Sequence, residues 1–545
     1  MRIALISTYT HPIALGLRYV SAYLKAHGQA VTMFFLRSKR DTAEANFSPA
    51  LLAELVERLR DADLIGMSLM TNTFHRACVL TQAIRDAGIK APIVWGGTHP
   101  TVAPEESSEV ADILCVGEGE HAMLELAETL EAGGDPSNIG SLVFRQNGRI
   151  IRNPVRQLYR ELDEYPFPDY DLDTHWVAAK DGFEPAAPDN LRGALHRFRI
   201  ESTRGCPYPC TFCNNAALLQ VYKGKGSWVR KRSADNVIAE IEQARSRFNT
   251  IEAINIVDDL FFVRSEADID AFSRLYVRNV NLPLELDAFP NTITREKVNA
   301  LARVPINLIS MGIQSGSADT LKHIYKRPTP IEKIVEGINI FADAKIPAEY
   351  HYIVHNPFET DRHRIETLRF AAQHHRGPAI LRVFPLQFYP GTPLYDQARE
   401  AGLIGQRHES AYQYTYTGKT HVLQSQYLDI WLRVVLRLRN RGVPRTFVHA
   451  LISGVTNRWV RRALDRPGFT PFAYGCYRVS RFVFRNMIYQ TFVRPLKYLR
   501  RKPRYEELHP EDEVTLPRNP MPTRPQPAKP VQKEKGVRMI FRPLQ

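Results

Sequence analysis

Short and almost wholly apolar runs alternate with helical patterns through the first 400 residues of this 545-residue chain. Strands that are apolar on both faces are typical of parallel sheets covered by helices on each side. The sequence therefore predicts an α/β domain, with a doubly wound parallel sheet, over residues 1–150. Its expected strands are Arg2–Ser7, Ala30–Leu36, Leu64–Met70, Pro92–Gly96 and Ile113–Gly117, followed by an edge hairpin over Phe144–Ile151.

A second α/β block is expected over residues 196–405, after a connector over 151–195 that contains the Pro-rich stretch Glu164–Asp171. Six βα units in about 200 residues are too few for an eight-stranded barrel. We therefore predict a partial (β/α)6 barrel. Its expected strands are Ile200–Thr203, Ala253–Val257, Leu284–Ala288, Leu308–Gly312, Tyr350–Val354 and Leu381–Phe388.

The net charge of +14 is concentrated near the C-terminus. Residues 430–505 contain 18 Arg and Lys against one acid, Asp465, so they carry +17 and all other residues sum to −3. We expect a basic amphipathic helical module over 406–505 and a Pro-rich, disordered tail over 506–545. Arg interleaved with bulky apolar residues suits the interfacial zone of an anionic membrane better than a phosphate backbone. A solvated helical face is the equally weighted alternative, and nucleic acid is not favoured.

The cysteine content predicts a reducing compartment. Three of the six cysteines lie within eight positions, a spacing that indicates a local metal site rather than a disulfide framework. The opening MRIALIS reads as a core strand and not as a signal peptide, and no run of 18 residues is free of charge. We expect a cytoplasmic protein, with peripheral contact to the inner face of the membrane through residues 430–505.

The cysteine triplet is the strongest local signal. Cys206, Cys210 and Cys213 follow a predicted strand at a CxxxCxxC spacing, and no fourth cysteine is close in sequence. A structural zinc site is normally closed by four protein ligands. Three thiolates suit an iron–sulfur cluster whose fourth iron is open to another ligand.

The motif RGCPYPCTFCN resembles the signature of the radical S-adenosylmethionine (SAM) superfamily. In that family the three cysteines hold a 4Fe-4S cluster, and SAM binds the open iron. Reduction by an external electron donor then produces a 5′-deoxyadenosyl radical that abstracts hydrogen from an unactivated carbon. The resemblance covers nearly all of residues 1–400 and implies that Cys206, Cys210 and Cys213 are both the metal ligands and the catalytic centre.

Two further segments match the family in the same order. Asp258 and Asp259 stand where the family has an acidic strand end that can contact SAM or substrate, although either can instead be a helix N-cap. The segment MGIQSGS, which includes Gln314 and Ser315, resembles the family's GIESGS and implies contact with the SAM ribose. The chain departs from the family's IGLPGET segment, because His355 or Asn356, and Phe358, replace its glycines.

The first domain resembles the Rossmann-like cobalamin-binding domain that precedes many radical SAM barrels. The matching stretches lie at the carboxyl ends of predicted strands, where doubly wound sheets bind their ligands. The axial-histidine motif DxHxxG is absent, and His11 lacks its spacing. The resemblance implies cobalamin binding through Ser68, Thr71, Gly96, Gly97, His99, Gly117, Glu118 and Gly119.

These resemblances favour a cobalamin-dependent radical SAM methyltransferase that acts on an unactivated carbon of a small hydrophobic molecule, either lipid-like or another natural product. The alternative is a radical SAM enzyme that cyclises, couples or rearranges its substrate. A third hypothesis is a membrane-associated, non-catalytic iron–sulfur protein. Transfer-RNA methylthiotransferases combine similar domains, but they carry three N-terminal cysteines, and here only Cys78 and Cys115 precede the triplet.

Overall fold

The computed structural model describes residues 1–9, 11–36, 47–146, 149–376, 379–405, 411–412 and 427–464. Contacts divide the chain into a unit ending at Arg494 and a second unit, residues 495–545, which lies wholly outside the described residues. The expected tail and the second half of the basic module, from 465 onward, are therefore also outside them.

The N-terminal sheet has the order β7-β6-β5-β4-β3-β1-β2-β8-β9. Its central strands β1 to β5 are parallel to one another. The doubly wound parallel sheet and its five expected strands are confirmed to within two residues at each end. These strands are β1 (Arg2–Ser7), β2 (Ala30–Phe35), β3 (Leu64–Ser68), β4 (Ile93–Gly96) and β5 (Ile113–Cys115).

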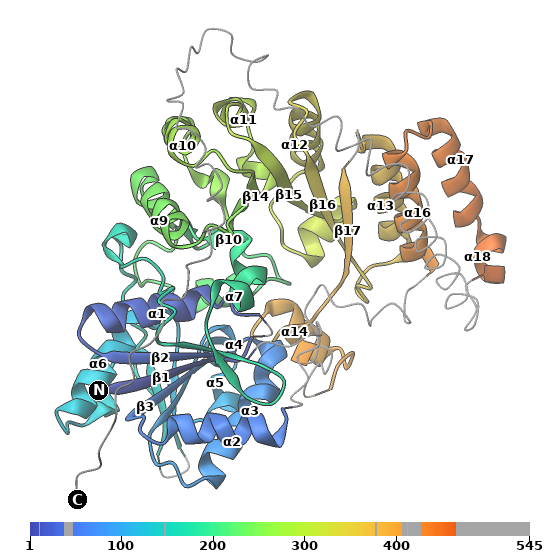
Figure 1. The fold of residues 1–545 in the computed structure, drawn as a ribbon. Coiled ribbons are helices and arrows are strands. Elements are labelled where there is room, and N and C mark those ends of the chain that lie inside the picture. Colours follow the sequence, from blue (N-terminus) through green and yellow to red (C-terminus); the bar gives the residue numbers. More distant parts are fainter. Residues whose placement is uncertain are drawn as a thin grey trace, which may run out of the picture. The chain divides into compact units, whose positions relative to one another are not determined.

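Helices cover both faces of this sheet (Figure 1). The alternate residues Ile3 and Leu5 of β1 pack in one apolar cluster with α1 (Leu15–Ala26) and α6 (Glu120–Glu131). Ala4 and Ile6 pack in another cluster with α2 (Pro49–Leu59) and α3 (Phe74–Asp86). Burial of both faces explains why the strand is apolar at every position from Ile3 to Ile6.

The edges of the sheet differ from the sequence expectation at one end. Strands β6 (Leu142–Gln146) and β7 (Arg149–Arg152) form the expected antiparallel hairpin, whose Asn147-Gly148 turn is outside the described residues. The expected connector, however, contributes β8 (His175–Ala178) beside β2 and β9 (Phe183–Pro185) beside β8. These strands are three and four residues long, which is too short for an alternating pattern to be recognised.

The second sheet consists of six parallel strands in sequence order, with β10 and β17 at its edges, so it is the expected partial barrel. The helices that follow its strands include α9 (Ala234–Arg247), α10 (Glu266–Asn279), α11 (Arg295–Ala300), α12 (Ile331–Asp343) and α13 (Asp361–His374), as Figure 1 shows. The strands are β10 (Arg197–Ile200), β13 (Ala253–Ile256), β14 (Leu284–Ala288), β15 (Ile306–Gln314), β16 (Ala348–Val354) and β17 (Ile380–Pro385).

The first barrel strand was expected at Ile200–Thr203 and is found three residues earlier, at Arg197–Ile200. Phe198 and Ile200 are buried, whereas Arg197 and Arg199 are exposed, so half of the strand is charged and lacks an apolar run. Thr203 belongs to β11 (Thr203–Arg204), which pairs antiparallel with β12 (Arg230–Lys231).

The described C-terminal part is helical, as expected. It contains α16 (Tyr427–Asn440), α17 (Arg445–Thr456) and α18 (Arg458–Leu464), and α16 and α17 contact α13 (Figure 1). The first of these helices carries an acidic residue, Asp429, which is buried. In the described part of the chain, no helix has the length and apolar character needed to cross a membrane.

Candidate active site

The cysteine loop lies just beyond the carboxyl end of β10, between β11 and α8 (Asn214–Val221). Cys206 and Cys210 are buried and pack with Leu260 and Phe289 in a small separate apolar cluster, against which Cys213 also packs. Tyr208 stacks on Phe289 with a centroid distance of 3.9 Å. The three thiols therefore lie in one partly desolvated place at the edge of the barrel.

The groups around the three thiols suit sulfur atoms that are bound to a metal, but they do not suit free thiolates. Burial raises the pKa of both Cys206 and Cys213 to about 12, so bare thiolates are disfavoured there. The backbone N–H groups of Tyr208 and Asn215 nevertheless donate to the sulfurs of Cys206 and Cys213. Arg327 Nη1 lies 4.0 Å from Cys210 Sγ. N–H donors and a cation around buried sulfurs fit an iron–sulfur cluster.

The three cysteines alone do not complete a site for a single structural metal ion, which normally has four protein ligands. Among the described residues, no three His, Cys, Asp or Glu side chains are placed to ligate one ion. A four-iron cluster binds each cysteine through a different iron, so it does not require three ligands around one centre. Three cysteine ligands with a fourth position open fit a multi-iron cluster better than a structural zinc ion.

Two of the barrel residues expected to bind cofactor lie beside this loop. Asp259 accepts a hydrogen bond from Asn215 Nδ2 at 2.8 Å, and desolvation by the surrounding loops raises the pKa of Asp259. Gln314 ends β15 with φ +70°, and its side chain lies close over Gly312. Arg327 donates to the carbonyl of Gly312 at 2.6 Å, which connects Gln314 with Cys210.

The other two barrel residues expected to bind cofactor, Asp258 and Ser315, form hydrogen bonds within the protein. Asp258 is buried and accepts hydrogen bonds from Ser202 N, Ser202 Oγ and Thr203 N, and desolvation raises the pKa of Asp258 to about 6. Ser315 is buried and hydrogen-bonds to Glu359 and Thr367. Their proposed cofactor contacts stay predictions, because each side chain already has protein partners.

A contact with helix α16 holds the loop after β16, where the sequence departs from the family's IGLPGET segment. His355 follows β16 with φ +59°, a conformation that glycine adopts without strain. Its N–H donates to Asp429 Oδ2 of α16 at 3.1 Å. Desolvation raises the pKa of Asp429 to about 6. The helix α16 thus fastens a loop of the barrel, a role for Asp429 that the sequence did not reveal.

Polar side chains line the accessible face of the barrel strands, which sequence reasoning also missed. Glu349 Oε1 accepts from His351 Nε2 at 2.7 Å and pairs with Arg382 Nε at 2.6 Å. Its buried Oε2 has no hydrogen-bond partner among the described residues. Desolvation by the neighbouring residues raises the pKa of Asp287, against the opposing effects of His351 and Ser310. The alternation of polar and apolar residues in the barrel strands is the sequence signal that could have indicated this polar face.

In the N-terminal domain, the small residues at the strand ends are arranged as predicted for a ligand-binding edge. Ser68 ends β3 and hydrogen-bonds Tyr9 beyond β1, and Gly96 ends β4. Gly97 has φ +92°, and a Cβ there would lie 2.8 Å from the carbonyl oxygen of Leu69. Met70, just beyond β3, is 42% exposed. Because glycines leave space at these strand ends, this edge of the sheet can receive the flat face of a large cofactor.

His99 does not extend from this edge as an axial ligand would. It is fully buried, with Nδ1 3.2 Å from Thr71 Oγ1 and Nε2 3.6 Å from Glu106 Oε2. The ring also contacts Phe74 and Tyr412. His99 is therefore not placed as an axial ligand, and a direct contact of His99 or Thr71 with the cofactor stays a prediction.

The segment Gly117–Gly119 faces the barrel domain rather than an open edge. Gly117 N donates to Thr101 Oγ1 at 2.9 Å, and Glu118 N donates to the hydroxyl of Tyr222. The carboxylate of Glu118 pairs with Arg230. The backbone amides of Gly117 and Glu118 are therefore already paired with protein acceptors, and a contact of Gly117, Glu118 or Gly119 with cobalamin stays a prediction.

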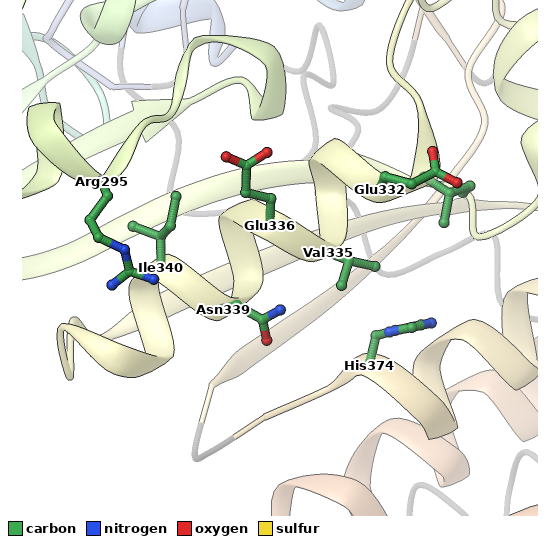
Figure 2. A pocket seen from close by; sticks show the side chains of 8 residues that line it. Arg295, Glu332, Val335, Glu336, Asn339, Ile340 and His374 are labelled. Carbon is green, nitrogen blue, oxygen red and sulfur yellow. The ribbon is translucent and has the colours of Figure 1, made fainter.

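A separate cavity of about 560 Å³ lies among the outer helices of the barrel. Figure 2 shows Glu332, Glu336 and Asn339 on α12 with His374 of α13 opposite them. Its lining includes none of the predicted site residues, so the cavity is not part of the site described above.

The fold and the cysteine loop define an enzyme of the radical SAM class that is preceded by a cobalamin-type domain. A family comparison agrees. The Radical SAM superfamily matches residues 200–371 and the B12 binding domain matches residues 1–127, more than half of the chain together. The chain belongs to the radical SAM enzymes that carry a B12-binding domain. The cofactors of this family are the 4Fe-4S cluster, SAM and cobalamin.

Two curated relatives match about two thirds of the chain. An uncharacterized methyltransferase of Pyrococcus horikoshii is 26% identical over 361 residues, covering 65% of this chain and 72% of the relative. An anaerobic magnesium-protoporphyrin IX monomethyl ester cyclase of Cereibacter sphaeroides is 22% identical over 360 residues, covering 64% and 55%.

A solved structure shares the fold. The radical SAM methyltransferase TsrM of Kitasatospora setae, determined with cobalamin and a [4Fe-4S] cluster bound, matches with a TM-score of 0.57 and 18% identity. The match covers 73% of this chain and 75% of TsrM.

Proposed function

We propose that this enzyme transfers a methyl group from SAM, by way of cobalamin, to an unactivated carbon of a small molecule. The observation that carries the proposal is the pairing of the triplet loop of Cys206, Cys210 and Cys213 with an N-terminal domain whose strand-end edge suits cobalamin. When bound, the cluster and SAM supply the radical, and cobalamin supplies the methyl group.

The residues of the chain hold these groups in this proposal. The three cysteines bind the cluster, and Arg327 balances negative charge at Cys210. Gln314 and Asp259 border the place where SAM binds. The edge formed by Ser68, Gly96 and Gly97 receives the cobalamin.

Product analysis tests the proposal. The anaerobically reconstituted protein is supplied with SAM, a strong reductant, cobalamin and a small-molecule extract. Formation of both 5′-deoxyadenosine and S-adenosylhomocysteine, with the second dependent on cobalamin, supports methyl transfer. 5′-Deoxyadenosine without S-adenosylhomocysteine supports the non-methylating alternative, for which the cyclase is a precedent among the relatives.

A lipid-like substrate and contact with a membrane belong to this proposal as its finer part. They are supported by the exposed aromatic side chains of α17 and α18, where Phe447 is 60% and Trp459 72% exposed beside several arginines. We expect the protein to co-sediment with anionic vesicles, and Phe447→Ser with Trp459→Ser to reduce this binding. Absence of sedimentation with either kind of vesicle contradicts membrane contact, and equal sedimentation with neutral and anionic vesicles contradicts a role of the arginines in it.

The polar strand face favours a different substrate chemistry. Glu349, His351, Arg382 and Asp287 line the barrel, and an apolar molecule in contact with them would displace water from charged groups without replacing its hydrogen bonds. A substrate that is polar at its reacting end is therefore the second candidate. Fractionation of the extract separates the two, because the active fraction partitions either into organic solvent or into water.

A further inference from the structure

Two loops from different domains meet next to the first cysteine of the triplet. One is the β5–α6 loop of the N-terminal domain, residues 116–119, which lies between Cys115 and Glu120. The other is the start of the cysteine loop at Arg204, two residues before Cys206. Two separate sets of contacts join them.

The first connection is ionic. Arg204 lies 3.0 Å from Glu120 and 3.6 Å from Glu118, both of the N-terminal domain, and 2.7 Å from Glu201 of its own domain. Glu118 also pairs with the buried Arg230 of β12. Desolvation acts to raise the pKa of Glu118, but the two guanidinium groups outweigh it and hold that pKa below its ordinary value. Glu118 is thus ionised and binds the loop at Arg204.

The second connection is a relay of aromatic rings. The hydroxyl of Tyr222 accepts from Glu118 N, and the ring stacks on Trp228 at a centroid distance of 5.3 Å. Trp228 Nε1 donates to the carbonyl oxygen of Cys206 at 2.8 Å. The relay therefore leads from an amide of the N-terminal domain to the peptide of the first cysteine.

Two glycines leave room for this relay. A Cβ on Gly117 would lie 2.1 Å from the hydroxyl oxygen of Tyr222, and one on Gly205 would lie 2.2 Å from the carbonyl oxygen of Trp228. Both residues also have positive φ, +89° and +91°. Since one glycine is at each end of the relay, the close packing depends on both domains.

We propose that the β5–α6 loop of the N-terminal domain positions Cys206 through Glu118, Tyr222 and Trp228. These are positioning residues, because they act on the cysteine through Arg204 and the Cys206 carbonyl. The inference deepens the proposed function, in that it connects the domain of one cofactor to the ligand loop of the other. Any displacement of the N-terminal loop would change the placement of the cluster.

The test begins with the full-length protein before cluster assembly, so that it does not depend on activity. The variants are Tyr222→Phe and Trp228→Phe, which remove one hydrogen-bonding group each. The matched control is Tyr276→Phe, since Tyr276 is a buried tyrosine of α10 whose hydroxyl donates to Leu282 O at 2.9 Å. Alkylation of each cysteine by iodoacetamide is followed by peptide mass spectrometry.

We expect alkylation of Cys206 to accelerate at least threefold in both relay variants and to stay unchanged in the control, with Cys210 reacting at its usual rate. After reconstitution, the relay variants should bind the normal amount of iron but show a changed electron paramagnetic resonance spectrum when SAM is added. Unchanged Cys206 alkylation in both variants overturns the inference. A wild-type protein that assembles the cluster but yields no methylated product contradicts only the proposed function.

Discussion

Replacement of Asp258 distinguishes an anchor of the cysteine loop from a cofactor ligand. The carboxylate accepts two backbone N–H groups, those of Ser202 and Thr203, at the same oxygen, Oδ1, and the Ser202 hydroxyl at Oδ2. In Asp258→Asn the amide oxygen can accept both N–H groups, and the amide nitrogen can donate to the hydroxyl. In Asp258→Ala both buried N–H groups lose their acceptor, at a cost of about 1–3 kcal/mol each.

The two variants should therefore differ in unfolding free energy by about 2–6 kcal/mol, with the asparagine variant the more stable. The pKa of Asp258 is raised from 3.8 to about 6 in the folded protein. The native state therefore binds more protons than the unfolded state between these values, so the contribution of Asp258 to stability falls as the pH rises from about 4 to 6. The Asp258→Asn variant has no group that titrates at this position, so it should not show this fall. In the wild type the fall lowers the free energy of unfolding by about 3 kcal/mol at neutral pH.

Denaturant unfolding of the three proteins at pH 4.5 and 7.5, together with SAM binding to the reconstituted protein, gives the comparison. An asparagine variant as unstable as the alanine variant would refute the hydrogen-bond reasoning. A stable asparagine variant with an intact cluster that no longer binds SAM would show that Asp258 is a cofactor ligand after all.

Three further substitutions have defined outcomes. Gly117→Ala places a Cβ 2.1 Å from the Tyr222 hydroxyl oxygen, at a residue whose φ is +89°. It should therefore lower the free energy of unfolding in denaturant by about 2–4 kcal/mol. The control Gly133→Ala, which has open space around it, should lower that free energy by less than about 2 kcal/mol. Arg327→Gln removes a cation 4.0 Å from Cys210 Sγ, so redox titration should give a lower midpoint potential for the cluster; an unchanged potential contradicts this electrostatic role. Asp429→Asn removes a carboxylate with a pKa of about 6 but keeps an acceptor for His355 N, so unfolding stability should fall less between pH 4 and 7 than in the wild type, and an equal fall would contradict the assignment.

The strands of the N-terminal sheet could be predicted because burial on both faces makes nearly every position apolar. In β1 this pattern extends from Ile3 to Ile6, and the expected and observed bounds agree. The first barrel strand was misplaced for the opposite reason, since Arg197 and Arg199 face the accessible side and leave only Phe198 and Ile200 as an apolar signal.

The candidate site was predictable where its residues are adjacent in sequence. The three cysteines lie within eight positions and were found from their spacing alone. The contacts between Glu118 and Arg230 and between His355 and Asp429 join residues 112 and 74 positions apart. No local pattern records such contacts, because they exist only once both domains and the helix α16 have packed.

The most direct test of the central claim compares Cys206→Ala with Cys78→Ala after anaerobic reconstitution. Cys78 is a half-buried cysteine of α3, in the N-terminal domain. Iron content, unfolding stability and the formation of 5′-deoxyadenosine from SAM are measured for both. A catalytic cluster held by the triplet predicts that Cys206→Ala stays folded but forms no 5′-deoxyadenosine, while Cys78→Ala resembles the wild type. Unfolding of Cys206→Ala, or undiminished SAM cleavage by it, would contradict the account.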